Sequence, residues 1–146
     1  FYSAQEFDLA PLLAAQPGAR LLELGRSCVH RDWRDRKVLE LLWRGLWLYA
    51  RHHGIDAMIG CASFPGVDAD AHARAIAFLR EAAPARADFS AAPPLIKGYL
   101  RVGARFGEGA VVDRQFGCTD VFVVLRMADV DRRYVDHIVG EGAEAA

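Results

Sequence analysis

The residues best suited to chemistry lie in the segment Glu23-Leu24-Gly25-Arg26-Ser27-Cys28-Val29, which precedes a long apolar helix that opens near Asp35. Glu23 and Arg26 stand three residues apart on a predicted strand, so the pattern offers a base and a cation. A carboxylate there could take a proton from an amine that attacks an acyl thioester. Spacing alone favours a plainer interpretation, in which Glu23 pairs with Arg26 or Arg20, because salt-bridged carboxylates outnumber catalytic ones.

A basic turn connects this strand to the helix. Backbone amides and the helix dipole at such a start can bind a phosphate, with each well-placed charge contributing on the order of 1 kcal/mol. A solvated charged turn explains the pattern equally well, because Asp32 and Asp35 neutralise half of the positive charge. The cationic residues of the turn are Arg31, Arg34, Arg36 and Lys37.

Three further residues could contribute to a site. Tyr99, in a short predicted helix, could protonate a departing thiolate, although a tyrosine in this setting is more often a packed aromatic residue. Asp113 and Asp120 flank a turn and could bind a cationic substrate, although aspartates are common at turns and strand ends. The histidines and cysteines have no metal-ligand spacing, so the sequence predicts neither a metal site nor a disulfide framework.

The composition is that of a single globular domain. The chain has 146 residues, of which 53% are hydrophobic and 25% charged, which is enough to bury a sizeable core. A net charge of −1 gives no basic excess for nucleic acid binding, so any anion-binding surface must be local. No apolar run approaches the roughly 20 residues of a membrane span. Three widely spaced cysteines favour a reduced, cytoplasmic compartment.

The hydrophobic pattern predicts a strand, a helix and a second strand in succession. Alternation places a strand over Arg20 to Val29, and a bulge near Gly25 is required if Glu23 and Arg26 serve one site. Asp35 is the predicted N-cap of a helix over about 36–53 that exposes only a narrow polar strip. The apolar run Ile55 to Phe64 predicts a central strand covered on both faces and parallel to the first, joined by a right-handed crossover.

The rest of the chain predicts a mixed α/β fold. Residues 1–19 have no regular pattern, and the Ala- and Pro-rich stretch 84–94 is a predicted loop. The expected elements are a helix from Asp68 or Asp70 to about Ala83, a helix from Pro94 to about Val102, strands around 110–113 and 120–125, and a polar tail.

Several segments together resemble the L-ornithine N-alpha-acyltransferases, a family of the GNAT superfamily. The resemblance implies a GNAT-like mixed sheet with flanking helices, and transfer of a 3-hydroxyacyl group from acyl carrier protein to the α-amino group of ornithine. It also implies that residues 1–146 form one domain, the central and C-terminal portion of the fold, with the N-terminal part missing. The segments are Glu23-Leu24-Gly25-Arg26-Ser27-Cys28-Val29, Leu41-Leu42-Trp43, Ile55 to Phe64, Pro94 to Arg101, and Phe116-Gly117-Cys118-Thr119-Asp120-Val121.

The resemblance also implies roles for individual residues. Glu23 would be the base and Tyr99 would protonate the leaving thiol. Asp113 and Asp120 are the acceptor-binding candidates that the residues themselves suggest. The predicted donor-binding residues are Arg26, Ser27, Cys28, Val29, Arg34, Arg36 and Lys37.

The donor is expected to be the phosphopantetheine arm of acyl carrier protein, with no tightly bound cofactor. Relatives that use coenzyme A have glycines before the donor helix, where this chain has Lys37 and Leu39. This departure disfavours acetyl-CoA, and the basic turn would instead dock an acidic carrier.

Glu23-Leu24-Gly25-Arg26 also resembles the Glu-x-Ser-Arg strand of acyl-homoserine-lactone synthases. Three alternatives therefore stay open: another N-acyl amino acid synthase, a signal synthase, and a non-catalytic acyl-carrier or lipid-binding relative. A lipid product would be compatible with a cytoplasmic protein that contacts the inner membrane peripherally.

Overall fold

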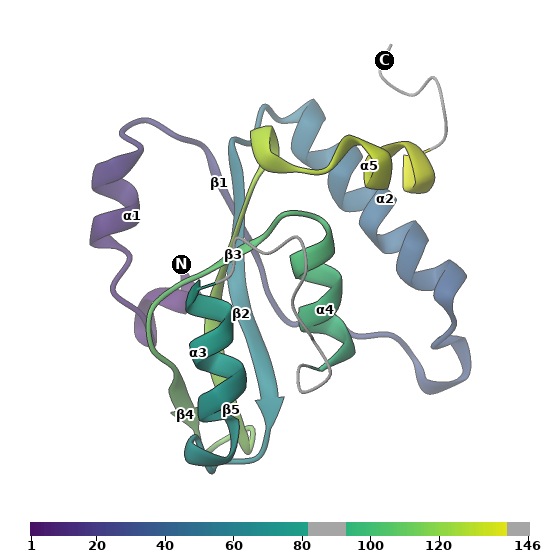
Figure 1. Ribbon diagram of the computed structural model, residues 1–146. Coiled ribbons are helices and arrows are strands. Elements are labelled where there is room, and N and C mark those ends of the chain that lie inside the picture. Colours follow the sequence, from purple (N-terminus) through teal and green to yellow (C-terminus); the bar gives the residue numbers. More distant parts are fainter. Residues whose placement is uncertain (82–92, 140–146) are drawn as a thin grey trace.

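The computed structural model describes residues 1–81 and 93–139, in which helices flank a mixed sheet (Figure 1). The strands are β1 (Leu21–Leu24), β2 (Ala57–Pro65), β3 (Arg105–Phe106), β4 (Val111–Asp113) and β5 (Cys118–Arg126). The helices are α1 (Ala10–Ala15), α2 (Arg36–His52), α3 (Ala73–Glu81), α4 (Pro94–Arg101) and α5 (Arg132–Val139). Short 3-10 turns cover Tyr2–Gln5, Arg31–Trp33, Asp70–His72 and Met127–Asp129.

The sheet has the order β1-β2-β5-β3, with β4 also paired to β5. β1 runs parallel to β2 from the pair Leu21–Ala57 to the pair Leu24–Gly60. β5 pairs antiparallel with the whole of β2, from Ala57–Arg126 to Pro65–Cys118. The mixed α/β class and the parallel pair joined by α2 are therefore confirmed.

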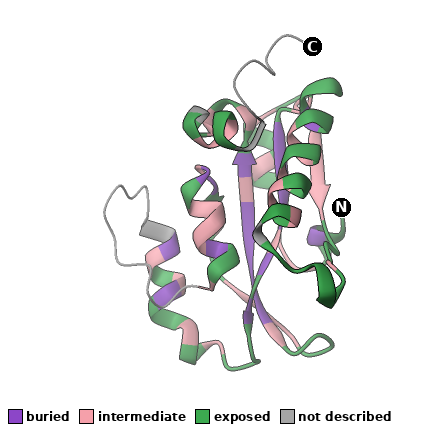
Figure 2. Cartoon of the chain, turned by 90° about the vertical axis from the view of Figure 1, so that its right-hand side faces the viewer, coloured by how far each residue is buried: buried purple, intermediate pink, exposed green. Residues whose placement is uncertain are grey.

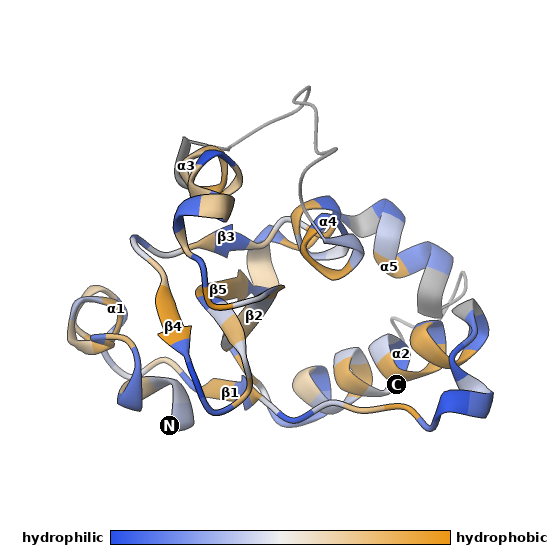
Figure 3. Cartoon of the chain, turned by 90° about the horizontal axis from the view of Figure 1, so that it is seen from below, coloured by the Kyte–Doolittle hydropathy of each residue, from blue (hydrophilic) through white to orange (hydrophobic). Residues whose placement is uncertain are grey.

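Alternation along the strands separates two faces of the sheet. One face carries Met58 and Val123 and packs against side chains from α2, α3 and α4 in the larger core cluster. The other carries Ile59 and Phe122, which pack with Leu9 from the N-terminal segment. Figure 3 shows α1 on one side of the strands and α2, α4 and α5 on the other, and Figure 2 shows that the buried residues concentrate in the central strands.

β2 is only partly covered on the N-terminal face, contrary to the expectation of a strand buried on both sides. Ile59 is buried, but Cys61 is half-buried and Ser63 is exposed. The short N-terminal segment covers only the first half of the strand, so the second half can line a cavity.

The limits of α2 follow the predicted signals, whereas its exposure does not. The Asp35 carboxylate accepts a hydrogen bond from the Val38 amide at 2.8 Å, and Gly54 ends the helix with φ of 57°. The prediction that only a narrow polar strip meets water was wrong, because Leu41 is 63% and Tyr49 50% exposed. The sheet covers too little of this 17-residue helix to bury its wide apolar face.

Other boundaries differ from the sequence-based expectation. The first strand ends at Leu24 instead of Val29, and the N-terminal region contains a 3-10 turn and α1. The short strand β3 was not predicted. The predicted loop lies almost entirely outside the described residues. α4 stops close to its predicted end, where Gly103 has φ of 95° and a Cβ would lie 2.6 Å from the Asp129 carbonyl oxygen.

Candidate active site

The site is built where β1 separates from β2. A Cβ on Gly60 would lie 2.5 Å from the Leu24 carbonyl oxygen, so only glycine allows this close approach. Two cavities open beside the point of separation, one of about 500 Å³ towards the N-terminal segment and one of about 300 Å³ towards α2 and α4. The residues that line both are Leu24, Gly25, Arg26, Cys61 and Ser63.

The larger cavity is strongly acidic. Its lining includes four carboxylates, from Glu6, Glu23, Asp113 and Asp120, together with the guanidinium of Arg26. Alternation explains the grouping, because Glu23 on β1 and Asp120 on β5 both point to the N-terminal face of the sheet. An excess of carboxylates in a shared cavity suits a cationic ligand.

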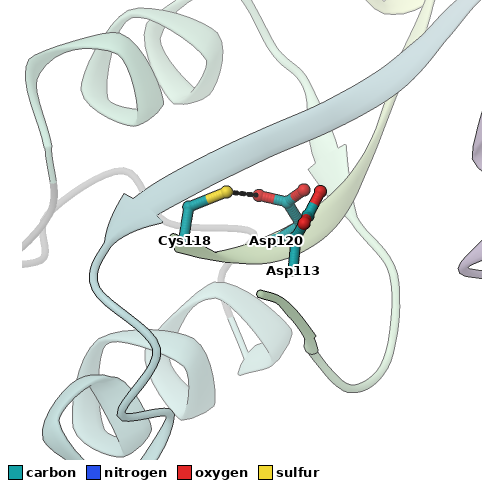
Figure 4. Close-up of side chains that lie close together, drawn as sticks. All are labelled: Asp113, Cys118 and Asp120. Atoms are coloured by element: carbon teal, nitrogen blue, oxygen red, sulfur yellow. Dashed lines mark hydrogen bonds between the residues drawn. The ribbon is translucent and has the colours of Figure 1, made fainter. Parts of the chain in front are cut away.

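Asp113, Cys118 and Asp120 lie close together at the start of β5 (Figure 4). One ligand atom from each lies within 4.8 Å of the others, a spacing that could hold a metal ion. The Cys118 thiol donates to Asp120 Oδ1 at 3.3 Å, and burial raises the pKa of Cys118, with neighbouring carboxylates acting in the same direction. A protonated thiol is a poor metal ligand, so the two carboxylates suit an ammonium group better.

Glu23 lies at the rim of the acidic cavity and accepts three short hydrogen bonds. Its Oε2 accepts from the Tyr2 amide at 2.6 Å, and its Oε1 accepts from the amide and the hydroxyl of Ser3, each at 2.6 Å. Burial raises the pKa of Glu23, but the hydrogen bonds from Ser3 and Tyr2 outweigh it, so the net pKa lies below the ordinary value. The carboxylate is thus held as an anion that anchors the N-terminal segment.

Glu6 has a different environment in the same cavity. Its Oε2 accepts a hydrogen bond from the Cys61 thiol at 3.5 Å. Burial raises its pKa above the ordinary value; the Cys61 hydrogen bond opposes this shift, whereas Asp120 and Asp113 add to it. Burial also raises the pKa of Cys61 to about 12, so this thiol is not a nucleophile at neutral pH.

Arg26 reaches the cavity through an unusual backbone conformation. Its φ is 52°, a left-handed value that costs a non-glycine residue on the order of 1 kcal/mol. This turn follows the end of β1, so the predicted bulge near Gly25 is not what brings Arg26 beside Glu23. The guanidinium carbon lies 5.8 Å from the centre of the Tyr2 ring, within the range of a cation–π contact.

The smaller cavity is largely apolar and contains Tyr99. Its walls include Leu39, Leu42, Trp43 and Leu95 from the helices, and Ser27 from the segment after β1. Tyr99 meets Trp43 edge to face, with ring centres 5.7 Å apart. Burial raises the pKa of Tyr99, so the phenol keeps its proton and can serve as a donor.

The structure brings together only some of the predicted donor-binding residues. Arg26 and Ser27 line the cavities, whereas Cys28, Val29, Arg34 and Lys37 do not. The Arg34 Nε donates to the Val29 carbonyl oxygen at 3.0 Å, which braces the turn. Arg36 opens α2, and its side chain lies outside the described part. Ser27, Cys28 and Val29 lie in a loop where their amides donate to no other described residue, so they are available to a ligand.

Sequence reasoning missed Ser3, Glu6, Cys61 and Ser63, all of which line the acidic cavity. Cys61 and Ser63 interrupt an apolar strand at alternate positions, a signal that could have identified a polar patch on one face. Ser3 and Glu6 precede any periodic segment, so nothing local distinguished them.

Comparison with known proteins agrees with this architecture. The model of the "Acetyltransferase (GNAT) domain" family matches residues 1–44. The chain is 48% identical to the L-ornithine N(alpha)-acyltransferase of Agrobacterium fabrum and 44% identical to that of Rhizobium meliloti, over 97% and 99% of its length. The chain is a homologue of these acyltransferases.

The chain spans 57% of the length of each of these two acyltransferases. A third, from Brucella abortus, is 42% identical over 99% of the chain and 60% of its own length. No solved structure matches the chain. The resemblance and the GNAT-like fold class are therefore confirmed, and the matched residues 1–44 include Glu6, Glu23 and Arg26. Within residues 1–81 and 93–139, no helix of this homologue has the length and apolar character needed to cross a membrane.

Proposed function

We propose that this chain contains the catalytic junction of an L-ornithine N(alpha)-acyltransferase. The protein would transfer a 3-hydroxyacyl group from acyl carrier protein to the α-amino group of L-ornithine, forming lyso-ornithine lipid. The observation that supports this most directly is that an acidic cavity and an apolar cavity meet where β1 separates from β2. Amine and thioester could enter from opposite faces of the sheet and meet in the gap.

The acidic cavity suits the acceptor. Ornithine carries two ammonium groups and one carboxylate, so it needs both acidic and basic partners. Asp113 and Asp120 are close enough to share the side-chain ammonium, while Arg26 is the cation in the lining that could bind the carboxylate.

The apolar cavity suits the donor arm. A pantetheine chain along Trp43 and Leu95 would place its thioester near Gly25. The amides of Ser27 to Val29, which donate to no other described residue, could then bind the phosphate or the oxyanion. Tyr99 would protonate the departing thiolate.

The carrier protein is the proposed partner of the basic turn. Carrier proteins of this kind are acidic, so the exposed Arg31, Arg34 and Lys37 would speed their encounter with the site and make it sensitive to salt. Because the product would be a lipid, peripheral contact of the enzyme with the inner membrane stays a prediction.

Product mass spectrometry on the complete protein tests the proposal. Incubation with 3-hydroxyacyl carrier protein and ornithine should yield lyso-ornithine lipid, with little product when other amino acids or S-adenosylmethionine replace ornithine. Asp113→Asn should raise KM for ornithine, whereas Asp136→Asn, which removes an exposed carboxylate on α5, should not.

Other products would favour the alternatives. An acyl-homoserine lactone or a different N-acyl amino acid as the main product would indicate another synthase. Binding of the carrier without any acylated amine would indicate a non-catalytic acyl-carrier or lipid-binding protein.

A further inference from the structure

We propose that Glu6 is the general base that accepts the proton of the acceptor amine, and that Glu23 is a positioning residue that holds Glu6 in place. The inference rests on the proposed acyl transfer and names the base for it. It reassigns the role that the sequence pattern suggested for Glu23.

Glu23 is poorly suited to accept a proton. Both of its oxygens already accept short hydrogen bonds, from the Tyr2 amide and from the amide and hydroxyl of Ser3. Protonation would weaken at least one of these charge-assisted bonds while the amide donors stay in place, so it would cost more than protonation of a free carboxylate.

The Glu6 carboxylate is more open to an acceptor amine than the Glu23 carboxylate is. Among the described residues, the weak donor Cys61 thiol lies 3.5 Å from Glu6 Oε2, and no donor binds Glu6 Oε1. Cys61 lines both cavities, so the Glu6 carboxylate lies one side chain away from the gap where amine and thioester would meet.

The two carboxylates are connected through Ser3. Its hydroxyl donates to Glu23. The Cys61 thiol lies 3.5 Å from both the Ser3 hydroxyl and Glu6 Oε2, and its single proton can be donated to either. Ser3 is 1% exposed, whereas Glu6, Glu23 and Cys61 are half-buried and line the cavity. Glu23 thereby anchors the turn Tyr2–Gln5, which directly precedes Glu6.

Burial and the neighbouring charges make Glu6 a stronger proton acceptor than an ordinary carboxylate. The groups that share its cavity are Glu23 on β1, Arg26 after β1, Cys61 on β2, Asp113 on β4, and Cys118 and Asp120 on β5. Burial raises the pKa of Glu6, and Asp120 and Asp113 raise it further.

The other carboxylates of the cavity are less available. Asp113 Oδ1 accepts the amides of Gln115 and Phe116, at 2.8 and 2.9 Å. Asp120 accepts the Cys118 thiol and is only 6% exposed. They therefore suit binding of the side-chain ammonium better than proton transfer.

The protons balance as follows. The α-ammonium of ornithine gives one proton to Glu6, and the neutral nitrogen forms the C–N bond. The C–S bond then breaks, and the thiolate takes a proton from Tyr99. The nitrogen of the new amide loses one more proton, which restores the Tyr99 phenol. Glu6 returns its own proton to solvent.

Variants in the complete protein test this assignment. Glu6→Gln, Glu6→Asp and Glu23→Gln are compared with Asp136→Asn as the matched control, using 3-hydroxyacyl carrier protein and ornithine across a range of pH. Glu6→Gln should lower kcat by about 10²- to 10⁴-fold and shift the acid limb of the pH profile to higher pH. Its activity should rise at high pH as free amine accumulates, and Glu6→Asp should recover part of the rate. Glu23→Gln should lower Tm and rate but keep the acid limb, and Asp136→Asn should match the wild type.

Distinct outcomes would overturn the assignment. If the wild type is active and Glu6→Gln keeps its kcat and acid limb, Glu6 is not the base, even if KM for ornithine rises. If only Glu23→Gln shifts the acid limb to higher pH, Glu23 is the base. A wild-type protein that acylates no amine would instead overturn the proposed function.

Discussion

Gly60→Ala provides the sharpest test of the β1–β2 junction. The new Cβ would lie 2.5 Å from the Leu24 carbonyl oxygen, and this backbone atom cannot rotate away as a side chain can. Overpacking usually costs about 1–3 kcal/mol, and the rigid neighbour puts this case near the upper end. A loss of about 3 kcal/mol would shift the folding equilibrium by roughly 100-fold and lower Tm by about 6–12 °C for a chain of this size.

Thermal unfolding followed by circular dichroism measures this effect. Gly45→Ala is the matched control, since its Cβ would meet nothing within 4 Å and Gly45 lies inside α2. Replacing glycine within a helix should stabilise the protein by about 0.5–1 kcal/mol. The two variants should therefore shift Tm in opposite directions. Equal or higher Tm for Gly60→Ala than for the wild type would refute the close approach of the strands.

Three other predictions follow from the described contacts. Asp35→Ala removes the cap of α2 and should cost about 1 kcal/mol in urea unfolding; an unchanged midpoint would contradict the cap. Iodoacetamide at mildly alkaline pH should alkylate exposed Cys28 well before Cys61, whose pKa of about 12 keeps it a thiol; faster labelling of Cys61, read by peptide mass spectrometry, would show a thiolate. Tyr99→Phe should lower kcat by about tenfold without raising KM for ornithine, less than most general acids provide because a thiolate leaves readily; full activity would remove Tyr99 from proton transfer.

Local signals in the sequence predicted the elements that carry the site. Asp35, Gly54 and Gly103 mark helix boundaries because capping and left-handed backbone depend on a few neighbouring residues. Strand, helix and strand in succession predicted the parallel pair, since a crossover allows little else. Strand alternation likewise places Leu22 and Leu24 on the face opposite Glu23, and both pack against the larger core cluster.

The pairing of strands distant in sequence decided the rest. Glu6, Cys61 and Asp120 come from segments far apart in sequence, and they meet because β5 pairs with β2 while the N-terminal turn lies over the same face. The hydrogen bonds from Tyr2 and Ser3 to Glu23 arise in the same way.

The sequence by itself therefore determined most of the helices and strands, though not α1 or β3, and which side chains share a face of a strand. Only the tertiary structure decided that both oxygens of Glu23 accept hydrogen bonds, whereas Glu6 is more open to a ligand. Hydrogen-bond partners and burial depend on contacts between distant segments. Contacts between distant segments also explain the exposed apolar side of α2, because an amphipathic pattern does not predict how much of a helix the sheet covers.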